Sequence, residues 1–305
     1  MAVEYHKEKG VAYVTISNPK KANILDRSTS NEISEIWKDA WEDLDVKSII
    51  LTGDGDKYFC AGHSLELPEG VTHDDNERIR TESIFWPLSG TVNGAKIGAD
   101  GRLGDHYPQI WKPVIGAING WAVGAGFYLM LASTDIRIAS HENARFKFAL
   151  LSQGWVGGGP GATYLTRQIS HADAMKILLT DEPFNAEEAL RINLVNEIVP
   201  HGELIKRAEE IAHGITKMPP LAVRMMKEFV TRFGDIPVPE AWRVHTLMNT
   251  LLTQVSTDGI EGRQAFLEKR PPEFTGGMMQ KGEPFPDLSE DQRKRLEDIK
   301  RELHG

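Results

Sequence analysis

Two short segments carry small residues where backbone amides can bind a single oxygen atom. Residues 59–65 (FCAGHSL) follow an expected strand and loop, and residues 124–126 (GAG) open an expected helix. Amides at the start of a helix lack an intrahelical partner and lie at the positive end of its dipole. Two such amides that converge on one oxygen form an oxyanion hole, which stabilises a developing enolate. The glycines would equally suit plain tight turns, and spacing alone does not decide whether the two segments meet.

Other chemistries have weaker support in the residue pattern. Residues 157–162 (GGGPGA) match G-x-G-x-x-A, and Asp181 and Glu182 follow about 20 residues later, where a ribose-binding acid is expected. Pro160 interrupts this segment and no regular βαβ ladder follows it, so dinucleotide binding is a remote alternative. The ten histidines include no pair at metal-ligand spacing with a third ligand nearby, and no G-x-S-x-G elbow occurs. We therefore expect no metal site and no serine hydrolase triad.

Composition sets the broad class. The chain has 305 residues, 40% hydrophobic and 26% charged, with a formal net charge of −9. An acidic chain is a poor general nucleic-acid binder, because phosphate contacts need clustered Lys and Arg. The single cysteine, Cys60, excludes an internal disulfide and fits a reducing compartment. The first nine residues lack an apolar core, and no apolar run approaches the roughly 20 residues of a membrane helix. We expect a cytoplasmic protein that binds neither nucleic acid nor membrane.

The elements that position these segments follow an alternating β and α pattern. Strands are expected at 12–16, 48–52, 113–118 and 135–139. A helix capped by Ser28 or Ser30 carries an apolar stripe from Ile33 to Leu44, and a buried helix spans 123–131. Alternating units of this length predict an α/β core.

The second half is mostly helical, and two stretches stand apart from the regular pattern. Helices are expected at 186–191, 203–214, 219–233 and 240–255. Residues 68–110 form a long connection rich in Gly and Asp, and connections of that length are usually functional lids or disordered segments. The tail from Thr275 contains Gly276-Gly277 and a charged segment, which predicts a surface helix from Leu288 to Leu303.

Several motifs occur together in an order that resembles the crotonase, or enoyl-CoA hydratase/isomerase, superfamily. They are NPKKANIL (18–25), SIILTGDGDKYFCAGHSLEL (48–67), KPVIGAINGWAVGAGFYLMLASTDIRIAS (112–140), ARFKFALLSQGWVGGGPGATYLTRQIS (144–170) and GIEGRQAFLEKRPPEF (259–274). The resemblance covers residues 3–274. It implies a spiral core of ββα units at 1–200 with the extended loop 68–110, a helical trimerisation region at 201–274, and a tail at 275–305. It also implies acyl-CoA thioesters as ligands, no cofactor beyond the coenzyme A of the substrate, and a homotrimer or dimer of trimers.

The resemblance assigns the oxyanion hole to the backbone amides of His63 and Ala125. Hydratases of the family hold a water between two glutamates, one acting as acid and one as base, and the matching positions here are Tyr128 and Leu150. Leucine transfers no proton, and tyrosine is a poor base near neutral pH but a suitable acid or hydrogen-bond donor. The segment A-G-H followed by E-L-P further resembles methylmalonyl-CoA decarboxylases, in which the matching histidine lies in the active site.

Further residues are carried over for ligand binding. Lys21 (with Lys20) and Ala61 match segments that line the coenzyme A site, and Lys269 matches a lysine that reaches a neighbouring subunit's coenzyme A; each lysine could equally be an ordinary surface residue. Glu66 replaces a lysine that meets phosphate in many members, so coenzyme A must be held differently. His106 beside Asp105 could supply a base from the loop, although a solvated polar loop is the simpler interpretation. Aromatic and small residues could line a wide acyl pocket: Trp86, Gly124, Phe148, Leu150 and Trp155.

These observations predict an enzyme that stabilises a thioester enolate without two-glutamate hydration. C–C cleavage, decarboxylation or hydrolysis with a base from the loop fit the residues better. The alternative from a different class is a catalytically silent acyl-CoA-binding protein that kept the fold and lost the acids.

Overall fold

A computed structural model describes residues 2–66, 110–156 and 161–279 of the chain, together with Gly70, Thr72, Asp74, 91–92, 95–96, 289–291, 294–295, 297–298 and 301. The chain divides into two compact units, Met1–Ile236 and Pro237–Gly305. Most of the expected loop 68–110 and most of the tail lie outside the described residues. Within that loop, β5 (Thr91–Val92) and β6 (Ala95–Lys96) pair antiparallel.

The first unit is built on a six-stranded sheet in the order β1-β2-β3-β7-β9-β12. β1 (Val3–Glu8) and β2 (Val11–Ile16) form an antiparallel hairpin, and every later neighbour is parallel. β3 (Ser48–Gly53) and β7 (Val114–Ile118) are buried along their whole length, as expected for central parallel strands with both faces covered. β9 (Ile136–Ser140) and β12 (Glu197–Val199) complete the sheet.

A second sheet has four strands in the order β11-β10-β8-β4. Its members are β4 (Tyr58–Cys60), β8 (Trp121–Val123), β10 (Arg145–Lys147) and β11 (Phe184–Asn185). Consecutive strands in the sequence alternate between the two sheets: β3 and β4, β7 and β8, and β9 and β10 each place one strand in the larger sheet and one in the smaller. A helix follows the second and third pairs, so the topology is a spiral of ββα units, and the expected α/β class is confirmed.

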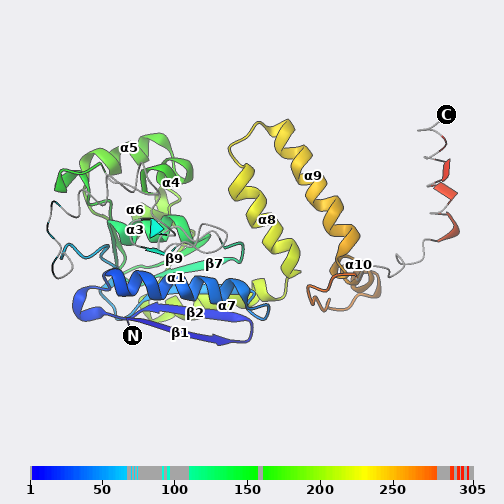
Figure 1. Ribbon diagram of the computed structural model, residues 1–305, viewed down its shortest axis with the longest axis horizontal. Helices are drawn as coiled ribbons and strands as arrows, with labels where there is room; N and C mark the ends of the chain where they lie inside the picture. Colours follow the sequence, from blue (N-terminus) through cyan, green and yellow to red (C-terminus); the bar gives the residue numbers. More distant parts are fainter. Residues whose placement is uncertain are drawn as a thin grey trace. The chain divides into compact units, whose positions relative to one another are not determined.

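Helices cover both faces of the larger sheet (Figure 1). Ile33, Trp37 and Ala40 of α1 (Arg27–Glu42) belong to the same buried cluster as Ile49 and Val114. The next residues along those two strands, Ile50 and Ile115, instead pack with α7 (Leu204–Thr216) through its buried positions Leu204, Ala208 and Ala212. This parity is the direct consequence of side chains alternating across a strand.

The remaining elements of this unit are helices that lie between or after the strands. They are the short 3-10 helices η1 (Pro19–Lys21), η2 (Leu151–Gln153) and η3 (His201–Glu203), and the helices α3 (Ala125–Ser133), α4 (Gly161–Gln168), α5 (His171–Thr180), α6 (Ala186–Arg191) and α8 (Pro220–Phe233). The sequence pattern predicted α6, α7 and α8 within a few residues. It placed no strand after residue 186, and β12 corrects that expectation.

Two helix starts differ from the sequence expectation. α1 is capped by Asp26, whose carboxylate accepts from the amide of Thr29 at 2.8 Å, and neither Ser28 nor Ser30 is the cap. The helix ends at Glu42, so Leu44 lies beyond its apolar stripe and is 89% exposed. The expected helix at 123–131 begins at Ala125, because Val123 is the last residue of β8 and pairs with Lys147.

The second unit contains α9 (Val238–Val255) and α10 (Asp258–Glu268). The buried carboxylate of Asp258 accepts from the amides of Thr275 and Gly276, and the amide of Met279 donates to the carbonyl of Val255. The first residues of the tail therefore fold back on the junction of these two helices. Among the described residues, no helix has the length and apolar content needed to cross a membrane.

Candidate active site

The two small-residue segments of the sequence meet in space. Residues 61–63 follow β4 and residues 124–125 follow β8, and these strands are parallel neighbours, so their carboxyl ends share one edge of the smaller sheet. Gly62 has φ +98°, and a Cβ atom built on it would lie 2.9 Å from the carbonyl oxygen of Val123 and 3.0 Å from the amide nitrogen of Ala125. Only glycine fits this contact, so the chain brings the turn before His63 directly against the start of α3.

The start of α3 is open toward that turn. Gly124 is the N-cap with φ +54° and makes no side-chain cap, so no side chain at that position takes up the first amides of the helix. A Cβ built on Gly126 would lie 2.1 Å from the carbonyl oxygen of Cys60, which presses the helix start onto β4. Gly124 and Ala125 are thus brought together with Ala61, Gly62 and His63 in one place, a geometry that suits two amides aimed at one oxygen.

The turn at 61–64 is tied to the N-terminal motif by backbone hydrogen bonds. The amide of Ala61 donates to the carbonyl of Ala22 at 3.1 Å, and the amide of Ser64 donates to the carbonyl of Leu25 at 3.0 Å. The amide of Leu25 in turn donates to the carbonyl of Gly62 at 2.8 Å. These bonds fix the backbone on either side of His63. The side chain of His63 is exposed.

Two asparagines that sequence reasoning did not assign hold the loop before β4. Buried Asn23 donates to the carbonyls of Asp54 and Tyr58 at 3.0 and 2.8 Å. Asn119 donates to the carbonyls of Gly55 and Tyr58 and accepts from the amide of Gly53 at 3.0 Å. Their presence in the N-P-K-K-A-N and N-G motifs was the available signal, since Asn side chains commonly bond neighbouring backbone at turns.

Tyr128 lies on the buried side of α3. Its ring centroid is 5.3 Å from that of Phe148, and a Cβ built on Gly161, the first residue of α4, would meet the Tyr128 ring at 2.2 Å. The residue is 5% exposed, and its hydroxyl makes no hydrogen bond to the described part of the chain. Burial, with a smaller contribution from the charge of Asp181, raises the pKa of Tyr128 well above its usual range. The hydroxyl is therefore a neutral donor, a state unsuited to a base.

Leu150 lies in the loop that follows β10. It is 8% exposed and shares a buried cluster with Ala125, Tyr128 and Phe148. The loop contains Ala149 at φ +59°, an uncommon conformation for a residue with a side chain. The position that carries a glutamate in hydratases is therefore an apolar wall in this chain.

Asp181 anchors this loop, a role that the sequence did not reveal. Its Oδ1 accepts from the amide of Ala149 at 2.5 Å and its Oδ2 from the amide of Ser152 at 2.8 Å. Burial acts to raise the pKa of Asp181, but the hydrogen bonds from Ser152 and Ala149 outweigh it and lower the pKa below its ordinary value. Both oxygens are engaged and the residue is 5% exposed, so Asp181 is not available as the ribose-binding acid of the dinucleotide alternative.

The far end of α3 holds a buried cation. Arg137 is 6% exposed and donates to the hydroxyl of Thr134 and to the carbonyls of Leu131, Thr134 and Leu194 at 2.8–3.2 Å. Burial lowers the pKa of Arg137 to about 10. A cation at the C-terminal end complements the helix dipole whose positive end lies at Ala125.

The expected coenzyme A residues lie in different parts of the chain. Lys21 Nζ is 3.8 Å from Glu66 Oε2, and both side chains are mostly exposed. The carboxylate that was expected to repel phosphate therefore has a lysine beside it. Lys269 caps α10 with φ +56° and belongs to the second unit. Trp155 is 47% exposed, whereas Phe148 is buried. His106, Asp105 and Trp86 lie outside the described residues.

The comparisons with known proteins agree with this arrangement. The Enoyl-CoA hydratase/isomerase family model matches residues 6–86 and 99–277. The chain is 34% identical over 276 residues to (E)-benzylidenesuccinyl-CoA hydratase of Thauera aromatica, covering 90% of this chain and all of that protein. It is 32% identical over 275 residues to carnitinyl-CoA dehydratase of Proteus mirabilis, covering 88% and 96%. The crystal structure of an enoyl-CoA hydratase from Bacillus anthracis superposes with a TM-score of 0.77 at 28% identity, covering 90% and 100%. The chain therefore belongs to the enoyl-CoA hydratase/isomerase family and is an acyl-CoA enzyme of the crotonase superfamily.

Proposed function

We propose that this enzyme stabilises the enolate of an acyl-CoA thioester between the backbone amides of His63 and Ala125. The observation that carries the proposal is the approach of the Gly62 turn to Ala125, where a Cβ would lie 3.0 Å from the Ala125 nitrogen. A fixed pair of amides stabilises the charge that develops on the thioester oxygen without reorganising during the reaction. The reaction that uses this enolate is then set by the groups around the acyl chain.

The proton chemistry that we propose uses one neutral donor in place of two carboxylates. Tyr128 holds its proton, and Leu150 has none to exchange. Tyr128 would donate to the acyl group or to a leaving oxygen, and a base must come from elsewhere. His106 with Asp105 is the candidate that the sequence offers for that base, and it stays a prediction. Relatives that are named hydratase and dehydratase support a reaction that adds or removes water with this altered acid and base.

Decarboxylation or C–C hydrolysis is the second candidate reaction. Loss of carbon dioxide forms the enolate directly and needs no base to remove a proton. The apolar residue at position 150 and the exposed side chain of His63 beside the oxyanion hole favour it. A panel assay separates the candidates: crotonyl-CoA, a β-keto-acyl-CoA, methylmalonyl-CoA and a cyclic dienoyl-CoA, with products followed by mass spectrometry. A gain of water from crotonyl-CoA would identify the first candidate, a reaction that adds or removes water with the altered acid and base, and loss of carbon dioxide would identify a decarboxylase.

The oxyanion hole is tested by removing one amide. Ala125 is the first residue of α3, a position where proline is well tolerated, so Ala125→Pro deletes the N–H and keeps the helix. We expect kcat to fall by about 10²–10³-fold, the usual effect of losing one such donor. Ala125→Gly retains the amide and serves as the matched control. Equal rates for the two variants would remove Ala125 from the mechanism.

Coenzyme A binding and assembly are further parts of the proposal. Lys21, Ala61 and Lys269 would contact the coenzyme A part of the substrate, and no other cofactor is required. Apolar side chains exposed on α9 and α10, among them Trp242 and Phe266, support association of copies of this chain as a trimer or dimer of trimers. The cytoplasm stays the predicted compartment.

A further inference from the structure

The loop that bears Leu150 is held in an uncommon backbone conformation by one carboxylate. Ala149 and Gly154 both have positive φ, and the amides of Gln153 and Trp155 donate to the carbonyl of Leu150 at 2.9 and 3.0 Å. An alanine rarely adopts this conformation unless its surroundings impose it. Asp181 supplies that constraint, because its two oxygens accept from the amides of Ala149 and Ser152 on either side of Leu150.

Asp181 is itself fixed by the helix that it ends. It caps α5 in the left-handed conformation, with φ +50° and its amide 3.2 Å from the carbonyl of Ile177. Aspartate is one of the few non-glycine residues that tolerate this conformation. A position that suits glycine is thus occupied by a residue whose side chain is buried against a loop 32 residues earlier in the sequence.

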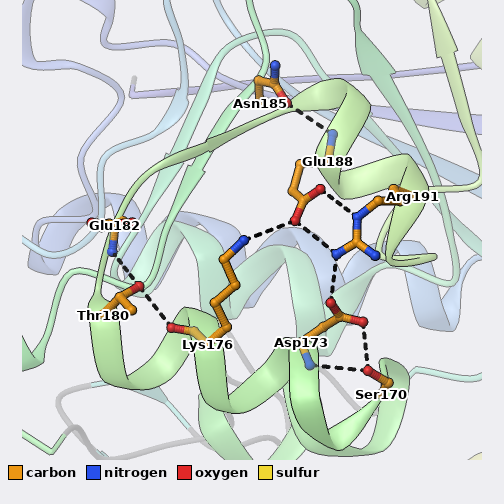
Figure 2. A network of polar contacts seen from close by, with 8 residues as sticks. All are labelled: Ser170, Asp173, Lys176, Thr180, Glu182, Asn185, Glu188 and Arg191. Atoms are coloured by element: carbon orange, nitrogen blue, oxygen red, sulfur yellow. Dashed lines mark hydrogen bonds and ion pairs between the residues drawn. The ribbon is translucent and has the colours of Figure 1, made fainter.

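A network of ion pairs on the outer side of the unit fixes α5 to α6 (Figure 2). Arg191 bonds Asp173 at 2.7 Å and Glu188 at 2.6 Å, and Lys176 lies 3.5 Å from Glu188. Figure 2 also shows Thr180 and Glu182, the residues on either side of Asp181, with the Glu182 amide directed at the Thr180 hydroxyl. Exposed ion pairs are individually weak, but several that share partners restrict where the end of α5 lies.

We propose that Asp181 is a positioning residue that shapes the acyl-binding side of the active site by fixing residues 149–152 beside Tyr128. The inference rests on the proposed function, because it assigns the wall formed by Leu150, Phe148 and Tyr128 to the acyl group. Asp181 has both oxygens engaged by the loop, so it acts through the loop and has no direct role on the substrate. Removing the Asp181 carboxylate should change the relative affinities for different acyl groups and leave the affinity for coenzyme A unchanged.

The test compares Asp181→Gly with the matched control Glu182→Gln in the full-length protein. Glycine accepts the left-handed backbone, so the variant removes the carboxylate without new strain. The neighbouring residue Glu182 is exposed, and its amide donates to the hydroxyl of Thr180. Two probes are titrated by calorimetry: free coenzyme A, and 3-phenylpropanoyl-CoA, a saturated thioester with no double bond to hydrate. Amide hydrogen exchange at Ala149 and Ser152 is followed in the same samples.

We expect Asp181→Gly to weaken the binding of 3-phenylpropanoyl-CoA by about tenfold, which corresponds to ~1.4 kcal/mol, with coenzyme A affinity within about twofold of native. Exchange at Ala149 and Ser152 should accelerate in this variant and not in Glu182→Gln. Equal weakening of both probes, or unchanged binding of both with faster exchange, would overturn the positioning role. If the native protein binds neither probe, the proposed function itself fails, and unchanged exchange at the two amides would separately show that Asp181 does not hold the loop.

Discussion

At the scale of single residues, our proposal for the proton chemistry depends on Tyr128, which matches the position where the family's hydratases hold a carboxylate. Its hydroxyl is buried with no hydrogen-bond partner in the described part of the chain. An unpaired buried polar group is destabilising, which makes this hydroxyl a suitable place to test the proposed proton donor. Tyr128 and Leu150 together leave at most one acid on this side of the site.

Tyr128→Phe separates stability from activity. Removing an unpaired hydroxyl should leave the free energy of unfolding unchanged or raise it by up to about 1 kcal/mol. If the hydroxyl donates in the transition state, kcat should fall by about 10²-fold or more on the substrate found in the panel. Urea unfolding and steady-state kinetics measure the two effects. Unchanged kcat would show that another group supplies the proton.

The pH profile of the native enzyme provides an independent check on the same residue. Burial, and then the charge of Asp181, raises the pKa of Tyr128 above that of free tyrosine, which is about 10. Loss of the donor would begin only above that pH. Tyr128 should therefore cause no fall in kcat/KM up to about pH 10, and any fall at lower pH should persist in Tyr128→Phe. A limb near pH 8 that disappears in Tyr128→Phe would contradict the assignment.

At the scale of elements, the sequence predicted strands of the larger sheet and none of the smaller sheet, whose edge carries the candidate site. Period-two and buried apolar runs predicted β2, β3, β7 and β9, and the small residues at 124–126 predicted the start of a helix. The contact of Asp181 with Ala149 could not be predicted, because it joins a helix end to a loop across 32 residues with no repeating pattern. The role of Arg137 could not be predicted for a similar reason. Its neighbours in sequence form β9, whereas its side chain bonds the C-terminal end of α3.

Arg137 is predicted to be the most important side chain for the stability of α3. Arg137→Met removes the donor to the carbonyls of Thr134 and Leu194, whereas the carbonyl of Leu131 still accepts from Gln168. Each buried unpaired group is destabilising by about 1–3 kcal/mol. We expect the free energy of unfolding to fall by about 3 kcal/mol or more in a urea titration. Arg167→Met is the control, because the pair of Arg167 with Asp235 is exposed and should contribute about 1 kcal/mol or less. Equal decreases in the free energy of unfolding for the two variants would show that the buried hydrogen bonds of Arg137 add no stability beyond that of an exposed ion pair.

At the scale of the whole molecule, the net charge bears on coenzyme A binding, and the exposed apolar side chains bear on assembly. A chain with net charge −9 repels a polyanion such as coenzyme A at long range, so binding depends on local lysines. Lys21 lies close to the turn at 61–64, which bears the proposed oxyanion hole, whereas Lys269 belongs to the second unit. That unit also exposes large apolar side chains on α9, with Val238 at 78%, Trp242 at 71% and Leu247 at 60%.

Exposure of this kind in a 69-residue unit is typical of a surface that another chain covers. We expect the native protein to sediment at three or six times the 34.0 kDa mass of the chain. Trp242→Glu places a charge in the centre of the apolar surface of α9, and it should shift the protein toward smaller species because an unpaired carboxylate resists burial. Arg243→Glu introduces the same group at the neighbouring polar position. It changes the net charge by −2, against −1 for Trp242→Glu, and so controls for added negative charge away from the apolar side chains. Sedimentation of the native chain as a monomer at micromolar concentration would contradict the assembly. It would also remove the neighbouring subunit that Lys269 is predicted to reach, so the lysine's contribution to coenzyme A affinity should vanish together with the oligomer.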